Sequence, residues 1–219
     1  MPLRDFGLLF LVCFVWGVNL VMTRWVVSDF HVPPLFFAAV RFLGVAAFLI
    51  PFLRPVPKNL FTLFIISMLI GCLNFGLLFV GLANADVSAA AVTGQLGVPM
   101  STIMSMVFLG EKIRWRRGLG IALAFAGVVV IAFDPSSFSL SYGLFLVFLA
   151  AVLGSAGGIV MKRMAPMGAL NLQAWVGLFS FAPLFAISFI LETGQLSAYA
   201  SGGWPVWLAS LFAILGVSV

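Results

Sequence analysis

The sequence predicts an all-α protein, a polytopic bundle of membrane-spanning helices. Of its 219 residues, 63% are hydrophobic and only 8% are charged, and the mean hydropathy is +1.24. A water-soluble domain carries about 25% charged residues, so this chain has too few polar side chains to cover a globule in water. The apolar residues also form long uncharged runs, and about 20 such residues are what a helix needs to cross a bilayer.

Charged residues and prolines bound these apolar runs, and each run predicts one helix. An eighth helix is expected to begin near Trp204 and to stop with the sequence at Val219, before a full crossing. The runs are continuously apolar, whereas a lipid-facing barrel strand alternates between apolar and polar residues, so we expect helices. The seven complete spans are predicted at about 6–24, 33–53, 60–83, 87–109, 116–133, 141–162 and 169–191.

The first run is interpreted as a membrane helix, because it stays uncharged from Phe6 to Thr23 and no small-residue cleavage site follows it. Cys13 and Cys72 both lie inside apolar runs and neither belongs to a CxxC pair. We therefore expect neither a disulfide framework nor a metal site. The sequence contains no P-loop either, so no cofactor is expected.

The basic residues predict the orientation of the chain. If the N-terminus is cytoplasmic, nine Lys and Arg residues fall on the inside and only Arg24 lies in an outside loop, which is a strong positive-inside signal. Because these cations punctuate apolar runs, membrane lipid is the expected partner of the net charge of +5, and nucleic acid is not. The inside residues are Arg4, Arg54, Lys58, Lys112, Arg114, Arg116, Arg117, Lys162 and Arg163.

An internal repeat is predicted at an offset of 139 residues. The segment Leu-Val-Met-Thr-Arg at 20–24 is matched by Ile-Val-Met-Lys-Arg at 159–163. Five helices separate the two copies, and this odd number makes the second copy inverted in the membrane. We therefore expect a complete five-helix unit at 6–133 and an incomplete one at 141–219.

Two residues of the fourth helix are candidates for a substrate site. Pro99 lacks an N–H, and its ring clashes with the carbonyl of Gln95, so a break is expected there, near the bilayer midplane. Interrupted helices at this depth point to substrate sites. The alternative is a structural kink whose freed backbone groups are satisfied by neighbouring helices.

Four more polar or aromatic residues lie inside the apolar runs. Arg41 is the one charge well inside a run, and it could face a substrate anion, snorkel towards the interface, or make a structural bond to carbonyls or Gln95. Trp16 and Asn19 share one helix face, which could line a cavity or pack against another helix, and Asn74 has the same two interpretations. A further motif, glycines at 154 and 158, predicts close helix packing, and such faces also permit a homodimer.

An ordered set of motifs resembles the EamA type of the drug/metabolite transporter superfamily. The motifs are Trp16-Gly17-x-Asn19, Pro33-Pro34 followed by Arg41-Phe42, Leu109-Gly110-Glu111, and Gly118-x-Gly120, and together they cover the first repeat. The resemblance implies ten helices in two inverted repeats of five, with both termini inside and export as the direction of transport. Because this chain stops in its eighth helix, we expect the ninth and tenth to be absent.

The sequence therefore favours a secondary transporter that exports small metabolites, such as amino acids or related compounds, across a bacterial inner membrane by alternating access. Its small-molecule substrate would contact Trp16, Asn19, Arg41, Asn74, Gln95 and Pro99. An alternative is a non-transporting membrane assembly or regulatory subunit, or an inactive fragment of a transporter. An enzyme is not expected, because no mid-depth His, Asp or Ser–His pair lies in the runs.

Overall fold

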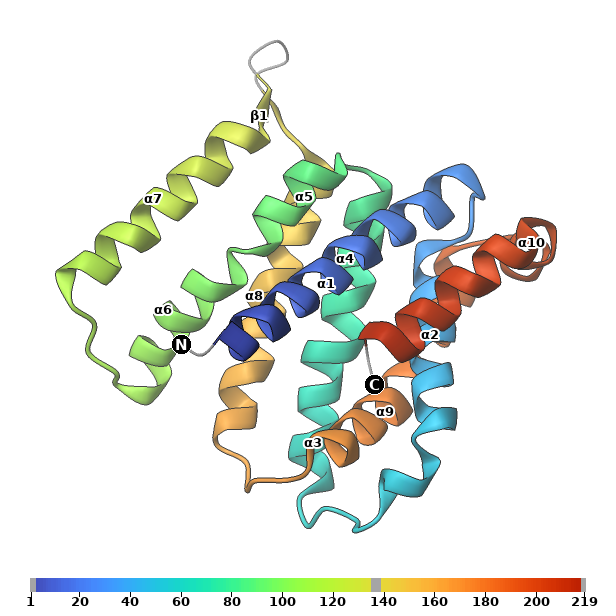
Figure 1. The fold of residues 1–219 in the computed structure, drawn as a ribbon, viewed down its shortest axis with the longest axis horizontal. Helices are drawn as coiled ribbons and strands as arrows, with labels where there is room; N and C mark the ends of the chain where they lie inside the picture. Colours follow the sequence, from blue (N-terminus) through green and yellow to red (C-terminus); the bar gives the residue numbers. More distant parts are fainter. Residues whose placement is uncertain (1–2, 135–138, 218–219) are drawn as a thin grey trace.

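The protein is a bundle of helices with one short β-ribbon (Figure 1). A computed structural model describes residues 3–134 and 139–217. The α-helices are α1 (Leu3–Asp29), α2 (Pro34–Phe48), α3 (Leu60–Ile66), α4 (Asn74–Ala83), α5 (Val87–Gly94), α6 (Gly97–Leu109), α7 (Trp115–Ala132), α8 (Tyr142–Lys162), α9 (Ala169–Leu191) and α10 (Gln195–Leu211). The shorter elements are the 3₁₀-helix η1 (Ile50–Leu53), the π-helices η2 (Ser67–Leu73) and η3 (Phe212–Gly216), and the paired strands β1 (Phe133–Asp134) and β2 (Ser139–Leu140).

The polytopic helical bundle predicted from the sequence is confirmed. Within the described residues, six continuous helical segments are long and apolar enough to cross a membrane. Three of them join shorter helices end to end, namely α3–η2–α4, α5–α6 and α10–η3. α2 is apolar but shorter, at 15 residues, and continues into η1. α1 ends at Asp29, five residues past its predicted end at Arg24. The Arg24 guanidinium donates to the Leu82 carbonyl, so this charge has a partner within the bundle and does not end the helix.

A helical part begins near Trp204, as predicted, but it is the second part of a longer, kinked helix whose first part the sequence did not predict. α10 begins at Gln195, breaks at Gly203, where φ is +60° and ψ is −153°, and continues through η3 to Gly216. The kink divides these 22 residues into two helical parts, and only their combined length suffices for a crossing. Its first turns carry several polar residues and form no apolar run, but the Gln195 amide fixes them by donating to the carbonyls of Ser188 and Glu192.

Two antiparallel helix pairs, α2 with α9 and α4 with α8, form the centre of the bundle. A Cβ added to Gly177 of α9 would lie 3.1 Å from the backbone nitrogen of Ala46, so this glycine lets α9 approach α2 closely. The packing predicted at Gly154 and Gly158 is only half right. A Cβ at Gly154 would meet the Asn74 amide at 2.7 Å, whereas Gly158 faces open space and Gly157 lies against α3–η2–α4 instead, because positions three apart share a helix face.

The π-helix η2 accommodates a hydroxyl group of α9. The Ser180 Oγ donates to the Ser67 carbonyl at 3.0 Å, and both residues are fully buried. Gly71 leaves the necessary space, since a Cβ there would lie 2.0 Å from that hydroxyl oxygen. Single π-turns of this kind are frequent near functional sites.

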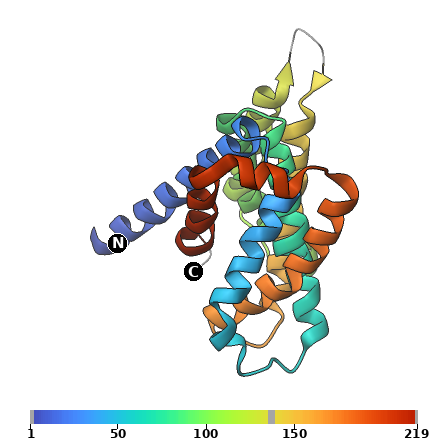
Figure 2. The same ribbon diagram turned by 90° about the vertical axis from the view of Figure 1, so that its right-hand side faces the viewer.

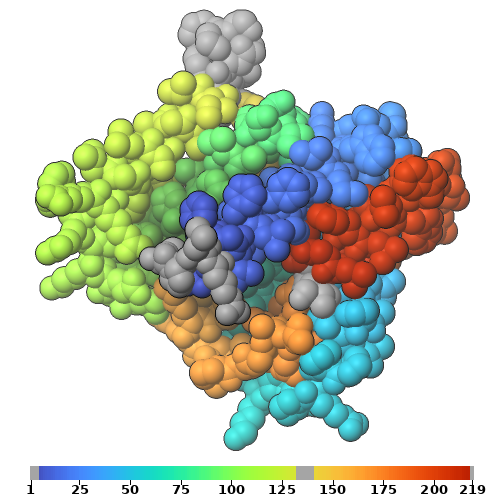
Figure 3. Space-filling view, in the orientation of Figure 1, coloured from blue at the N-terminus to red at the C-terminus, as the bar shows by residue number. Residues whose placement is uncertain are grey.

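The periphery of the bundle exposes apolar side chains to the surroundings, as expected for lipid-facing helices. α7 stands apart from the centre (Figure 1), and most of its described residues are exposed. α1 lies across the face seen in Figure 3, and Figure 2 shows its N-terminal end extending away from the bundle. Its first half is exposed, whereas Val26 near its other end is fully buried.

Candidate functional site

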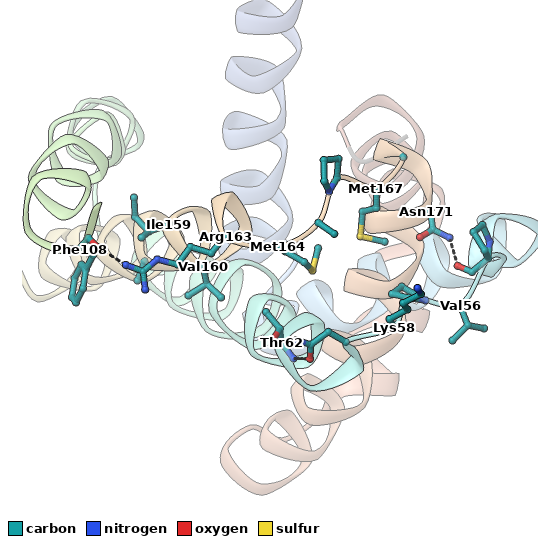
Figure 4. A pocket seen from close by; sticks show the side chains of 17 residues that line it. Val56, Lys58, Thr62, Phe108, Ile159, Val160, Arg163, Met164, Met167 and Asn171 are labelled. Atoms are coloured by element: carbon teal, nitrogen blue, oxygen red, sulfur yellow. Dashed lines mark hydrogen bonds between the residues drawn. The ribbon is translucent and has the colours of Figure 1, made fainter. Parts of the chain in front are cut away.

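A large cavity opens at the end of the bundle where the α2–α3 loop meets the α8–α9 loop (Figure 4). Its volume is about 1150 Å³, which is just above the range of about 300–1,000 Å³ common for small-molecule sites. The walls come from the α2–α3 loop, α3, α6, α8, the α8–α9 loop and the start of α9, so a molecule in the cavity would touch segments more than 100 residues apart. The lining residues are Pro55, Val56, Pro57, Lys58, Asn59, Thr62, Phe108, Ala156, Ile159, Val160, Arg163, Met164, Ala165, Pro166, Met167, Gly168 and Asn171.

The lining combines cations, amides and apolar side chains. Among the described residues that line the cavity, Lys58 and Arg163 are cationic and none is an Asp or Glu. The Arg163 guanidinium donates to the Phe108 carbonyl. The Asn171 amide nitrogen donates to the carbonyls of Phe52 at 2.6 Å and Pro55 at 3.2 Å, which fixes the α2–α3 loop against α9. The cavity therefore suits a molecule with an apolar part and a polar or anionic part.

The other end of the α2–α9 pair is closed by the Glu192 carboxylate. It accepts hydrogen bonds from the backbone N–H groups of Leu35 at 2.8 Å and Phe36 at 3.0 Å, in the first turn of α2. The Ser188 hydroxyl also donates to it, at 2.6 Å. Helix N-termini present unsatisfied N–H groups and partial positive charge, so a carboxylate binds well there.

Aromatic rings fill the space behind this carboxylate. The Phe36 ring makes edge contacts with Phe185, Phe189 and Tyr199, with ring centroids 5.4, 6.1 and 5.3 Å apart. The Tyr199 hydroxyl lies 2.9 Å from the Ser210 oxygen, so its polar atom has a partner in the bundle. Helices α2, α9 and α10 are thus packed together at one end, while α9 and the loop that follows α2 border an open cavity at the other.

Three of the polar candidates from the sequence are at helix contacts. The Arg41 side chain is 2% exposed, and its guanidinium carbon lies 4.2 Å from the centre of the Phe75 ring of α4. Asn74 donates to the Ala150 carbonyl of α8 at 2.6 Å, which is the structural alternative considered for it. Asn19 is buried, at 4% exposure. Trp16, which was expected to share its environment, is 51% exposed.

Gln95 and Pro99 lie at the predicted break of the fourth span. α5 ends at Gly94 and α6 begins at Gly97. The carbonyl of Gln95 accepts from the Val98 N–H at 3.1 Å, because residue 99 has no N–H to offer. Gln95 lines a second, smaller cavity of about 280 Å³ against α7, whereas Pro99 is buried in α6.

None of the six predicted contact residues lines the larger cavity, so a role of theirs in substrate binding stays a prediction. Sequence reasoning missed Asn171 and Glu192 as contact-forming residues and used Lys58 and Arg163 only as orientation signals. Glu192, Arg163 and Asn171 each bond to a partner at least 55 positions away in the sequence. Lys58 lines a cavity that is formed by loops distant in the sequence. The one available signal was the charge of Lys58 and Arg163 beside two helix ends.

The sequence of the chain is similar to those of known membrane transporters. The model of the EamA-like transporter family matches residues 6–133. The chain is 32% identical over 208 residues to the "Probable amino-acid metabolite efflux pump" of Escherichia coli K12, covering 88% of this chain and 66% of that protein. The protein of the same name in Salmonella typhimurium is 30% identical, with the same coverage. The chain thus spans just under two thirds of the length of these relatives.

Two further similarities cover more of the chain. The "Uncharacterized inner membrane transporter YedA" of E. coli K12 is 24% identical over 220 residues, covering 95% of this chain and 71% of that protein. A protein of known crystal structure superposes with a TM-score of 0.57 at 21% identity, over 95% of this chain and 77% of the other, and it supports the fold alone. With more than half of its length matched by the family model, and with its helical membrane bundle, the chain belongs to the EamA-like transporter family.

Proposed function

We propose that the protein is a secondary transporter that exports small amphiphilic metabolites, such as amino acids or related compounds, across the bacterial inner membrane. The cavity of about 1150 Å³ at one end of the α2–α9 pair, opposite the end closed by Glu192, is the observation that carries this proposal. A cavity open to one side only is what alternating access requires of one of its two states. The efflux-pump names of the relatives supply the direction.

The proposed orientation makes this cavity face the cytoplasm. Lys58 and Arg163 line it, and the cations of the α6–α7 segment lie at the same end of the bundle. Positive charges of short loops stay on the cytoplasmic side, so the N-terminus is proposed to be cytoplasmic and the Glu192 end periplasmic. An exporter loads its cargo from the cytoplasm, which agrees with a cavity on that side.

The proposal is tested by filling the cavity. Val160 lines it, whereas the next residue, Met161, is exposed and lies outside the lining. In proteoliposomes preloaded with radiolabelled leucine, the wild-type protein and Met161→Trp should release label faster than protein-free vesicles. Val160→Trp should reduce the release to the protein-free rate. No release by the wild-type protein, or equal release by the two tryptophan variants, would contradict the proposal, and the first result would favour a non-transporting membrane subunit.

A further inference from the structure

The cavity contains a lysine that no acidic side chain neutralises. Lys58 follows the α2–α3 loop prolines and lines the cavity. Among the described residues, the Lys58 ammonium makes neither an ion pair nor a hydrogen bond. An ammonium group beside apolar walls, with no protein partner, is available to an anion that enters from water.

Three other cations at this end have partners. The Lys162 ammonium donates to the Ser105 hydroxyl at 3.2 Å and lies 3.9 Å from the Glu111 carboxylate. The Arg117 guanidinium donates to the Thr102 hydroxyl at 3.1 Å. The second cation of the lining, Arg163, holds the end of α6 through the Phe108 carbonyl. Lys58 therefore differs from these in that its charge serves no contact of the fold.

A hydrogen-bond acceptor lines the same cavity as this lysine. The Asn171 amide nitrogen donates to the carbonyls of Phe52 and Pro55. Pro55 lies three residues before Lys58 in the sequence. This orientation leaves the amide oxygen as an acceptor on the cavity side. Figure 4 shows Asn171 and Lys58 on one side of the cavity and Arg163 on the other. The wall between them is apolar and contains Val160, Met164 and Met167.

We propose that this cavity binds a zwitterionic amphiphile, an apolar α-amino acid, through its free carboxylate. The Lys58 ammonium receives the carboxylate, the Asn171 amide oxygen accepts from the ammonium group of the ligand, and the methionine-rich wall takes the apolar side chain. Unbranched methionines adapt to side chains of different shape, so the wall admits a range of apolar residues. This inference rests on the proposed function, because it treats the ligand as the transported substrate. The experiment below measures binding of the ligand without transport.

Protection of an engineered thiol measures this binding in detergent. Met167→Cys places a thiol in the lining, and Cys13→Ser removes the exposed native thiol, while Cys72 stays buried. The rate of maleimide labelling is followed against the concentration of L-leucine, of L-leucinamide, which lacks the carboxylate, or of phosphatidylglycerol. Lys58→Gln is compared with Lys58→Arg, which keeps the charge, and with Arg54→Gln, which removes a cation of the same loop outside the lining.

Leucine should slow labelling at a concentration about tenfold lower than leucinamide does, a difference equivalent to about 1.4 kcal/mol. Lys58→Gln should remove this preference, and both Lys58→Arg and Arg54→Gln should keep it. Equal protection by leucine and leucinamide, loss of the preference in Arg54→Gln, or no protection by either would overturn the proposal. Protection by phosphatidylglycerol alone would also overturn it, by assigning Lys58 to a lipid headgroup. Leucine protection without flux in proteoliposomes would count against transport but not against this site.

Discussion

Glu192 offers the sharpest test of what holds the closed end together. Its carboxylate accepts from two N–H groups in the first turn of α2, 156 and 157 residues away in sequence, and from the nearby Ser188 hydroxyl. Glu192→Ala leaves both backbone N–H groups without this acceptor at a half-buried helix N-terminus. Loss of a helix cap costs about 1 kcal/mol and hydrogen bonds to charged groups contribute about 1.5–3 kcal/mol each. Because the site is partly exposed, we expect a total of about 2–3 kcal/mol.

The native thiols supply the assay. Cys72 is 3% exposed and Cys13 is exposed, so in a Cys13→Ser background a thiol-reactive dye reports the unfolding that uncovers Cys72. A loss of about 2–3 kcal/mol should lower the melting midpoint of Glu192→Ala by about 5–10 °C for a chain of this length. Glu192→Gln keeps one carbonyl acceptor without the charge and should show about half of that shift.

Glu111 is the matched control, because it is the other glutamate of the sequence. Its ion pair with Lys162 is 3.9 Å long and both side chains are about half exposed. Such surface pairs contribute about 0–1 kcal/mol, so Glu111→Ala should shift the midpoint by no more than about 2–3 °C. If Glu192→Ala melts with the wild-type protein, or if Glu111→Ala loses as much, the carboxylate does not hold α2 and α9 together as argued.

Two further predictions concern the packing and the orientation. Gly71→Ala would place a Cβ 2.0 Å from the Ser180 hydroxyl and should destabilise the protein by about 1–3 kcal/mol. Gly120→Ala, where a Cβ would have no atom within 4 Å, should be neutral or slightly stabilising. Melting curves followed by tryptophan fluorescence compare the two variants, and equal midpoints would contradict the argument. In intact cells a membrane-impermeant maleimide should label Thr193→Cys but label Lys112→Cys only after permeabilisation, and labelling of both from one side would refute the predicted topology.

The sequence predicted those features that depend on neighbouring residues. The span 169–191 agrees with α9 at both ends, because apolar residues fill it and Gly168 and Glu192 flank it. The break between α5 and α6 follows from Pro99 alone, since a missing N–H and a ring clash are local effects. Charge and hydropathy likewise decide between lipid and water as the main solvent of a segment.

The features that the sequence did not predict depend on distant partners. The π-turn at 67–73 exists because Ser180 of α9 bonds to the Ser67 carbonyl, 113 residues away. The start of α10 at Gln195 depends on carbonyls of the preceding helix end, and its residues are too polar to stand out as a membrane segment. The cavity arises where two loops meet, and each loop by itself looks like an ordinary basic turn.

The two arginines that end the repeated segments make the same kind of contact at opposite ends of the bundle. Arg24 donates to the Leu82 carbonyl in the last turn of α4, and Arg163 donates to the Phe108 carbonyl in the last turn of α6. A cation at a helix C-terminus satisfies an unpaired carbonyl and opposes the partial negative charge there. α4 ends on the side closed by Glu192, and α6 ends beside the cavity (Figure 1). This contact explains physically why an arginine ends both matching segments, 20–24 and 159–163. The general similarity of apolar helices would not explain it. In the proposed alternating-access motion, in which the open end closes and the closed end opens, each arginine must either keep its carbonyl partner or exchange it for another.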